Sequence, residues 1–166
     1  PVLLGNSLGG AIALSMALDY PRLVSGLVLW GTGARLRVLP QILDGLANDF
    51  LPTVDLLTGL AYDNEADPAL KDEGRRVMAA TRPEVLHGDY AACHQFDVMD
   101  RLAQIDLPCL VVCGQGDKLT PLKYSEFLRD HIKGARLEII AGAGHMIHHE
   151  QPLAGAGALR GFLQDL

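Results

Sequence analysis

Residues 2–10 of this chain read Val-Leu-Leu-Gly-Asn-Ser-Leu-Gly-Gly, so that a short apolar run ends in a Gly-x-Ser-x-Gly motif. The apolar run predicts a buried strand over residues 2–6. The apolar segment after Ser7 predicts a helix that ends near Tyr20, because Pro21 disfavours helical geometry in the residue before it. This helix is apolar on nearly every side, so we expect it to be covered on most sides. A serine at a sharp turn between strand and helix stands clear of the sheet and is a candidate nucleophile.

The neighbours of Ser7 have expected roles in that turn. Gly5 and Gly9 flank it, and we expect both to be glycine because a Cβ atom would crowd the close approach of strand and helix. The backbone N–H of Leu8 lies at the predicted helix start, where partial positive charge gathers, and is a candidate oxyanion donor. The motif alone also fits a glycine-rich turn with a serine cap, and that alternative stays open.

Length and composition narrow the class of protein. The chain has 166 residues, which suffices for one domain with its own core. Its net charge is -6 and it has no basic cluster, which argues against a nucleic-acid partner. No apolar run approaches membrane-spanning length, so we expect no membrane partner. The three cysteines, Cys93, Cys109 and Cys113, lack zinc-site spacing and predict reduced thiols in a cytoplasmic protein.

Strand and helix signals alternate along the rest of the chain. Further strands are predicted over residues 23–30, 109–113 and 136–140. A short helix and turn are predicted over residues 96–107, and longer helices over residues 120–132, beginning with Thr120 as N-cap, and 152–166. Such alternation predicts an α/β fold in which a parallel sheet of about four strands carries helices on both faces.

A long helical insert interrupts this pattern. Apolar residues at helical spacing fill residues 34–95, and no strand signal intervenes. The chain is therefore predicted to divide into a core, residues 1–33 and 96–166, and a helical cap or lid, residues 34–95. A purely structural helical layer is the alternative, but the insert follows a strand whose end should lie near Ser7.

Three predicted strands end in residues that can carry acyl-transfer chemistry, namely Ser7, Asp117 and His145. Carboxyl ends of parallel strands meet at one edge of the sheet, so the three side chains are expected to lie close together. Each has an alternative role: Asp117 could satisfy backbone N–H groups in a turn, and His145 could be a hydrogen-bonded core residue. Asp97 could replace Asp117, although capping the next helix is the favoured interpretation for it.

Other residues near these strand ends are weaker candidates. Trp30 and Met146 adjoin strand ends and are expected to line a substrate pocket, although core packing fits both equally well. His148, His149 and Glu150 together with His145 superficially resemble metal ligands, but their position at the start of the last helix favours a solvated turn. We expect no metal and no cofactor.

The motifs at 5–10, 114–117 and 142–145, which read Gly-Asn-Ser-Leu-Gly-Gly, Gly-Gln-Gly-Asp and Gly-Ala-Gly-His, resemble the three signatures of the α/β-hydrolase superfamily. The similarity is closest to its serine-hydrolase branch of esterases, lactonases and carbon–carbon-bond hydrolases. It implies Ser7 as nucleophile, His145 as general base, Asp117 as the acid of a catalytic triad and the Leu8 N–H in the oxyanion hole. A serine rather than a carboxylate at the nucleophile position argues against the haloalkane dehalogenase and epoxide hydrolase branches.

The resemblance implies a small-molecule ester or lactone substrate and an acyl-enzyme. Carbon–carbon hydrolysis, acyl transfer or perhydrolysis by the same triad are alternatives, as is a non-catalytic interaction module.

The family carries several strands before its nucleophile, and none precedes Val2 here. We therefore expect that the N-terminal half is absent, that the isolated chain is weakly active, and that the bare edge of the first strand forms a homo-oligomer.

Overall fold

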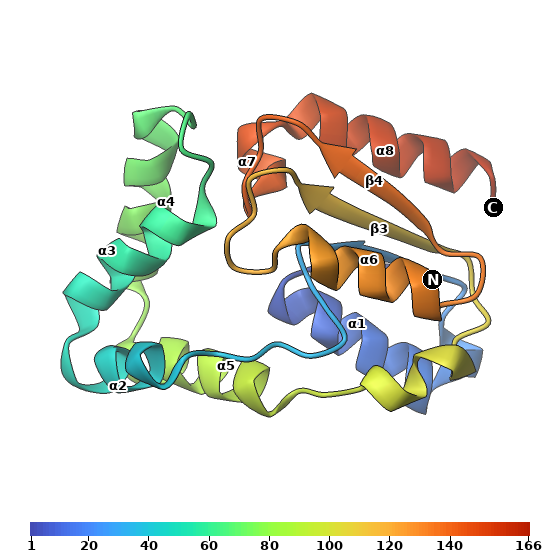
Figure 1. Cartoon of the computed structure of the whole chain (residues 1–166), viewed down its shortest axis with the longest axis horizontal. Coiled ribbons are helices and arrows are strands. Elements are labelled where there is room, and N and C mark those ends of the chain that lie inside the picture. Colours follow the sequence, from blue (N-terminus) through green and yellow to red (C-terminus); the bar gives the residue numbers. More distant parts are fainter.

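The computed structural model describes residues 1–166 and contains one four-stranded sheet of order β1-β2-β3-β4 (Figure 1). The strands are β1 (Val2–Asn6), β2 (Gly26–Trp30), β3 (Cys109–Gly114) and β4 (Arg136–Ile140). All neighbouring strands are parallel. The register sets Asn6 beside Trp30 and Trp30 beside Val112, so the ends of β1, β2 and β3 lie together. The predicted parallel sheet of about four strands is confirmed.

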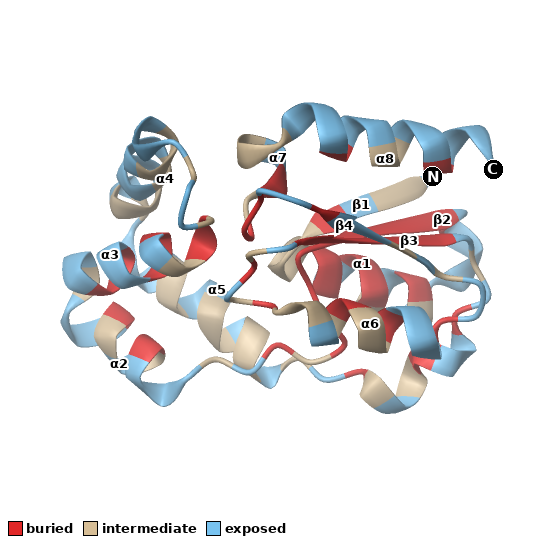
Figure 2. Ribbon diagram, turned by 45° about the horizontal axis from the view of Figure 1, so that its top comes forward, coloured by how far each residue is buried: buried red, intermediate tan, exposed pale blue.

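Helices cover both faces of this sheet, as predicted. On one face lie α1 (Leu8–Asp19) and α6 (Leu122–His131), and on the other lie α7 (Ile147–Glu150) and α8 (Pro152–Gln164) (Figure 2). Successive side chains of a strand point to opposite faces, so β2 supplies both cores. Leu27 and Leu29 pack toward α1 and α6, whereas Val28 and Trp30 pack toward α8.

A helical insert connects β2 to the 3₁₀-helix η2 (Met99–Gln104). It consists of α2 (Pro40–Asn48), α3 (Phe50–Ala61), α4 (Pro68–Ala80) and α5 (Pro83–Gln95). Its own small core contains Ile42, Leu46 and Leu57. Figure 1 shows these helices beyond the carboxyl ends of the strands, which is where ligands bind in parallel sheets. The division into a core and a cap domain at residues 34–95 stays a prediction.

Two local predictions were wrong. Leu23 lies in the 3₁₀-helix η1 (Pro21–Leu23), and β2 begins only at Gly26. Thr120 does not cap α6; Pro121 occupies the N-cap position and makes no side-chain cap bond. Both errors concern the residue at which an element begins, which apolar periodicity does not determine. The expected cover of the helix after Ser7 is confirmed on most sides, because its exposed residues, Ile12, Met16 and Asp19, share one face.

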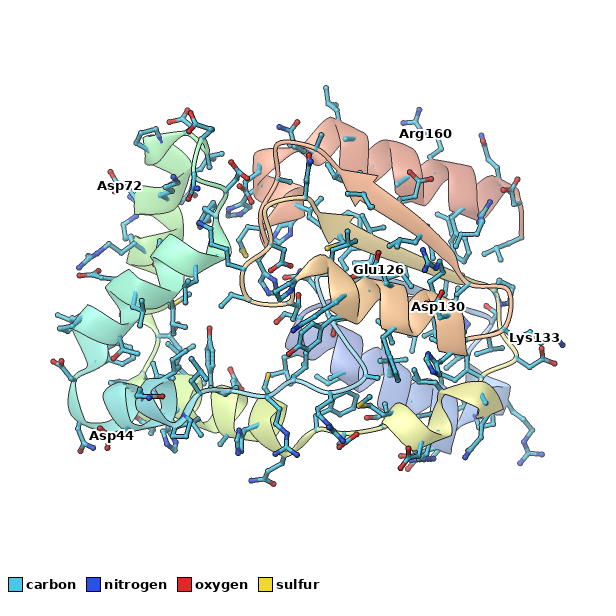
Figure 3. All side chains as sticks on the ribbon, in the orientation of Figure 1. Asp44, Asp72, Glu126, Asp130, Lys133 and Arg160 are labelled. Carbon is cyan, nitrogen blue, oxygen red and sulfur yellow. The ribbon has the colours of Figure 1, made fainter.

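Charged side chains lie mainly on the outside of this fold. Figure 3 labels six of them, of which Glu126 is half-buried and the other five are exposed: Asp44, Asp72, Asp130, Lys133 and Arg160. None of the helices combines the length and the apolar character needed to cross a lipid bilayer.

Candidate active site

Ser7 occupies a strained turn between β1 and α1. Its φ of 53° and ψ of -117° make it the only residue besides glycine with a positive φ. The turn is held from both sides, because the Ser7 N–H donates to the Trp30 carbonyl at 2.9 Å and the Ser7 carbonyl accepts from Thr32 Oγ1 at 2.8 Å. A non-glycine residue keeps such a conformation only where its surroundings enforce it, and such residues cluster at active sites.

The glycines around Ser7 differ in their roles. A Cβ atom on Gly5 would collide with the Gly9 carbonyl group, so Gly5 is required for the approach of β1 and α1. The expectation for Gly9 was wrong, since a Cβ there would meet nothing within 4 Å. The crowded helical position is Gly10, where a Cβ would lie 2.5 Å from Thr32 Cγ2.

His145 and Asp117 form a buried pair. His145 Nδ1 lies 2.9 Å from Asp117 Oδ2, and the two residues are 4% and 6% exposed. Asp117 Oδ1 accepts the backbone N–H groups of Leu119 at 2.9 Å and Thr120 at 2.8 Å. Asp117 therefore satisfies turn N–H groups and also contacts the imidazole ring, whereas its role as the acid of a triad stays a prediction. With Nδ1 engaged, Nε2 is the ring nitrogen left for proton transfer.

The loop that carries His145 meets the end of β1 and β2. Asn6 Nδ2 donates to the His145 carbonyl at 3.3 Å and to the Trp30 carbonyl at 3.2 Å. A Cβ atom on Gly31, which has a φ of 46°, would lie 3.1 Å from His145 Nδ1 and 3.3 Å from Asp117 Oδ2. The fold thus brings the segments of Ser7, Asp117 and His145 together, although no hydrogen bond joins Ser7 Oγ to His145. Catalytic hydrogen bonds often tighten only when substrate is bound.

A cavity of about 340 Å³ opens between Ser7 and the insert. Eleven of its sixteen lining residues are hydrophobic, and both Ser7 and Leu8 face it. As the first residue of α1, Leu8 has its N–H outside the helix's own hydrogen-bond ladder. The wall opposite Ser7 comes from the insert and its connection to β2: Leu36, Arg37, Val38, Leu39, Ile42, Leu60, Leu86, Asp89, Tyr90 and Cys93.

Trp30 and Met146 do not line this cavity. Trp30 is 6% exposed and packs in the core beneath α8, where its Nε1 has no hydrogen-bond partner. Neither residue therefore makes the contact with this cavity that was expected of it. The residues that do line it come mostly from residues 36–42 and from α5, and no motif in the sequence singled them out.

Two polar groups in the cavity wall are hard to ionise. Burial raises the pKa of the Tyr90 phenol to about 12. Burial, and then the neighbouring Asp89 carboxylate, raise the pKa of the Cys93 thiol. Both side chains are therefore neutral at physiological pH, and the charged groups that line this wall are Arg37 and Asp89. Cys93 lies in α5, whereas Cys109 and Cys113 are buried in β3, and all three are free thiols.

Hydrogen bonds join the corner between α3 and α4 to the His145 loop. The Ala61 carbonyl accepts the N–H groups of His145 at 2.8 Å and Met146 at 3.2 Å. The carboxylate of Glu150 bridges the same two segments, because Oε1 accepts from Asp63 N at 2.7 Å and Oε2 from Gly144 N at 2.9 Å.

The loop that carries Asp117 is joined to this corner as well. Lys118 Nζ donates to Asn64 Oδ1 at 2.7 Å. The insert is thus hydrogen-bonded to both the loop that carries His145 and the loop that carries Asp117.

The cluster on α7 is a short helix rather than the expected turn, and it is only partly solvated, because His148 is exposed whereas His149 and Glu150 are half-buried. Glu150 is engaged with backbone N–H groups, and His149 Nδ1 lies 3.0 Å from the Tyr62 hydroxyl. Burial, with the nearby His149 and His145 rings, lowers the pKa of His148. No group of three His, Cys, Asp or Glu side chains in residues 1–166 is arranged to hold a metal ion.

Asp97 lies away from the site. Its carboxylate accepts from Arg35 Nε at 2.6 Å and from the Met99 N–H at 3.2 Å, and the Arg35 hydrogen bond lowers its pKa. Asp97 precedes Val98, the N-cap residue of η2, and its bond to the N–H of Met99, the first residue of η2, resembles the capping role that was expected. Sequence reasoning missed the supporting contacts of Asn6, Gly31, Thr120 and Glu150; only Gly31, in a Gly-Thr-Gly turn after a strand, gave a usable signal.

Comparisons with known proteins agree on one family. The family model described as serine aminopeptidase, S33, matches residues 1–152. A pimeloyl-[acyl-carrier protein] methyl ester esterase of Neisseria meningitidis is 30% identical, and the alignment covers 99% of this chain and 70% of the esterase.

Solved structures extend the similarity. A structure described as a thermophilic esterase is 41% identical with a TM-score of 0.91, over 99% of this chain and 66% of that one. An N-acyl homoserine lactone degrading enzyme is 30% identical with a TM-score of 0.84, over 97% of this chain and 66% of that one. The chain thus spans about two thirds of the length of these relatives.

Proposed function

Since this chain belongs to the S33 family of α/β hydrolases, we propose that it is a serine hydrolase of small ester or lactone substrates. The observation that carries the proposal is the conformation of Ser7, whose positive φ presents its hydroxyl at the floor of an apolar cavity. The similarity to an esterase and to a lactone-degrading enzyme supports the substrate class.

In this proposal Ser7, His145 and Asp117 act as a catalytic triad. His145 Nε2 takes the Ser7 hydroxyl proton while Oγ attacks the ester carbonyl, and then gives the proton to the departing alcohol. A water molecule then attacks the acyl-enzyme. His145 Nε2 takes the water proton and gives it to Ser7 Oγ, which releases the carboxylic acid and restores Ser7. Asp117 fixes the imidazole tautomer through the 2.9 Å contact at Nδ1 and stabilises the imidazolium ion.

The oxyanion of the tetrahedral intermediate would be bound by the Leu8 N–H. This donor lies at the start of α1, beside Ser7, and is unused by the helix itself. A preorganised backbone donor at a helix N-terminus needs no reorganisation when negative charge develops.

We further propose that the insert, residues 34–95, is the cap of the acyl-binding site. Residues 36–42 and α5 form a wall opposite Ser7 that is mostly apolar, although Arg37 and Asp89 belong to it, and its hydrophobic majority with the neutral Tyr90 and Cys93 side chains favours a hydrocarbon group. The cavity volume of about 340 Å³ suits a small or medium acyl group. Three free cysteines support a cytoplasmic location, which is also a proposal.

A fluorophosphonate probe tests the nucleophile directly. Attack by Ser7 Oγ on phosphorus, with loss of fluoride, should attach one probe, and peptide mapping should locate it on Ser7. The Ser7→Ala variant should lose both labelling and hydrolysis of a p-nitrophenyl ester series, by about 10³-fold or more in rate. Ser15→Ala is the matched control, because the Ser15 hydroxyl only bonds back to the Ala11 carbonyl within α1. Absence of label from Ser7, or label on another serine, would contradict the proposal.

A further inference from the structure

Thr120 contacts both members of the Asp117–His145 pair. It is 5% exposed, and its Oγ1 lies 2.9 Å from Asp117 Oδ2 and 3.3 Å from His145 Nδ1. A hydroxyl carries one proton, and the carboxylate can only accept, so the Thr120 hydroxyl donates to Asp117. The Nδ1–H of His145 has its shorter contact with Asp117 Oδ2, at 2.9 Å, so the 3.3 Å contact with Thr120 Oγ1 is the weaker one and the hydrogen bond to Asp117 dominates the effect of the hydroxyl.

We propose that Thr120 is a positioning residue, whose hydroxyl donates to the same Asp117 oxygen that accepts the His145 Nδ1 proton and so limits how strongly the carboxylate holds the imidazolium. Asp117 receives backbone donors at Oδ1 from Leu119 and Thr120, and those survive any side-chain change at position 120. The hydrogen bond from the Thr120 hydroxyl is therefore separate from these backbone hydrogen bonds, and it reaches only Oδ2.

The direction of the effect follows from electrostatics. A donor at Oδ2 takes up part of the negative charge that faces the imidazole ring. Without that donor the same charge acts more fully on the imidazolium, which then loses its proton only at higher pH. The substitution Thr120→Val removes the hydroxyl and nearly preserves the shape of the side chain.

Other ionisable groups surround the pair and must stay constant in the comparison. Cys113 on β3 faces Asp117, and His148 on α7 faces His145. Lys118, Glu150, His149 and Tyr62 are bonded to the insert or to the His145 loop rather than to the carboxylate. The substitution at Thr120 changes none of them.

The test is an NMR titration of the His145 ring in the full chain, with the signal assigned by its loss in His145→Gln. Thr120→Val should raise the pH at which the ring is half-protonated, and Thr120→Ser should return it close to wild type. Thr58→Val removes another buried hydroxyl, which donates to the Val54 carbonyl, and should leave the titration unchanged. An unchanged titration in Thr120→Val, or an equal shift in Thr58→Val, would overturn the assignment.

The kinetic consequence rests on the proposed function. In the active enzyme, the acid limb of the kcat/KM profile should move to higher pH in Thr120→Val, with KM nearly unchanged. The ring titration does not require turnover, so it decides the role of Thr120 even if Ser7 takes no label. If Thr120→Val is insoluble, Thr120→Ala replaces it in the same comparison, with the same two outcomes.

Discussion

At the scale of single residues, the site depends on backbone geometry more than on side-chain contacts. Ser7 is held at a φ of 53° by hydrogen bonds to Trp30 and Thr32 on the neighbouring strand and its following turn. Gly5 allows α1 to begin directly against β1. The strained serine is thus supported by groups that have no chemical role of their own.

A matched pair of substitutions separates the two glycines of the Gly-x-Ser-x-Gly motif. Gly5→Ala should lower the free energy of unfolding by about 3 kcal/mol or more, because its Cβ meets the backbone of Gly9. Gly9→Ala should raise it by about 0.5–1 kcal/mol, because alanine stabilises a helix where there is room for it. Urea unfolding measures both. A destabilised Gly9→Ala variant, or a Gly5→Ala variant as stable as wild type, would show that α1 does not approach β1 most closely at Gly5.

The three proposed catalytic residues were predictable because their positions follow from the order of strands. Ser7, Asp117 and His145 each follow an apolar run, and parallel strands end at one edge. Thr120 and Glu150 were not predictable as partners of the site. Their roles depend on which loop faces which, and a threonine after an aspartate reads equally well as the start of a helix.

At the scale of elements, the short helix α7 has a larger role than its length suggests. Glu150 on α7 accepts one N–H from the insert and one from the His145 loop. Two segments far apart in the sequence are therefore fixed by the two oxygens of one carboxylate. The insert position and the His145 position are coupled through this residue.

Glu150→Gln should weaken that coupling. The amide keeps one oxygen acceptor but turns an NH₂ group toward the other N–H, so one charge-assisted hydrogen bond is lost. We expect the free energy of unfolding to fall by about 1–3 kcal/mol, with earlier proteolytic cleavage near residues 61–67. Glu65→Gln is the control, since Glu65 is exposed and its carboxylate forms no ion pair. Equal stability of the Glu150 and Glu65 variants would contradict the bridging role.

The presence of each helix and strand was easier to predict than the residues at which it begins and ends. The sheet and its covering helices followed from the alternation of apolar runs, whereas residues 23–25 were assigned to β2 although η1 occupies Leu23. The exposure of Ile12 could not be read from α1, because an apolar pattern does not say whether a neighbour is present.

At the scale of the whole molecule, β1 is an edge strand with apolar surroundings. It pairs only with β2, and Leu4, Ile12 and Tyr20 are 47%, 55% and 59% exposed. An unpaired strand beside exposed apolar side chains favours association with another chain. We therefore propose that this chain forms a homo-oligomer through β1 and α1.

Light scattering coupled to size-exclusion chromatography tests the proposal across a concentration series. We expect a dimer or larger assembly whose dissociation constant rises at least about tenfold in Leu4→Lys, because a lysine at the edge opposes pairing. Leu153→Lys is the control, since Leu153 is 89% exposed on α8, on one face of the sheet rather than at its β1 edge. A monomer at every concentration, or equal weakening by both substitutions, would exclude β1 as the interface.

The bond from the His145 N–H to the Ala61 carbonyl has a consequence for protein engineering. If the insert is exchanged for that of a relative in order to alter substrate preference, the backbone carbonyl that binds the His145 N–H is exchanged with it. A chimera joined at residues 34 and 95 must therefore preserve the backbone of residues 61–64, whereas a graft limited to residues 36–42 and α5 would reshape the cavity wall opposite Ser7 and leave that hydrogen bond unchanged.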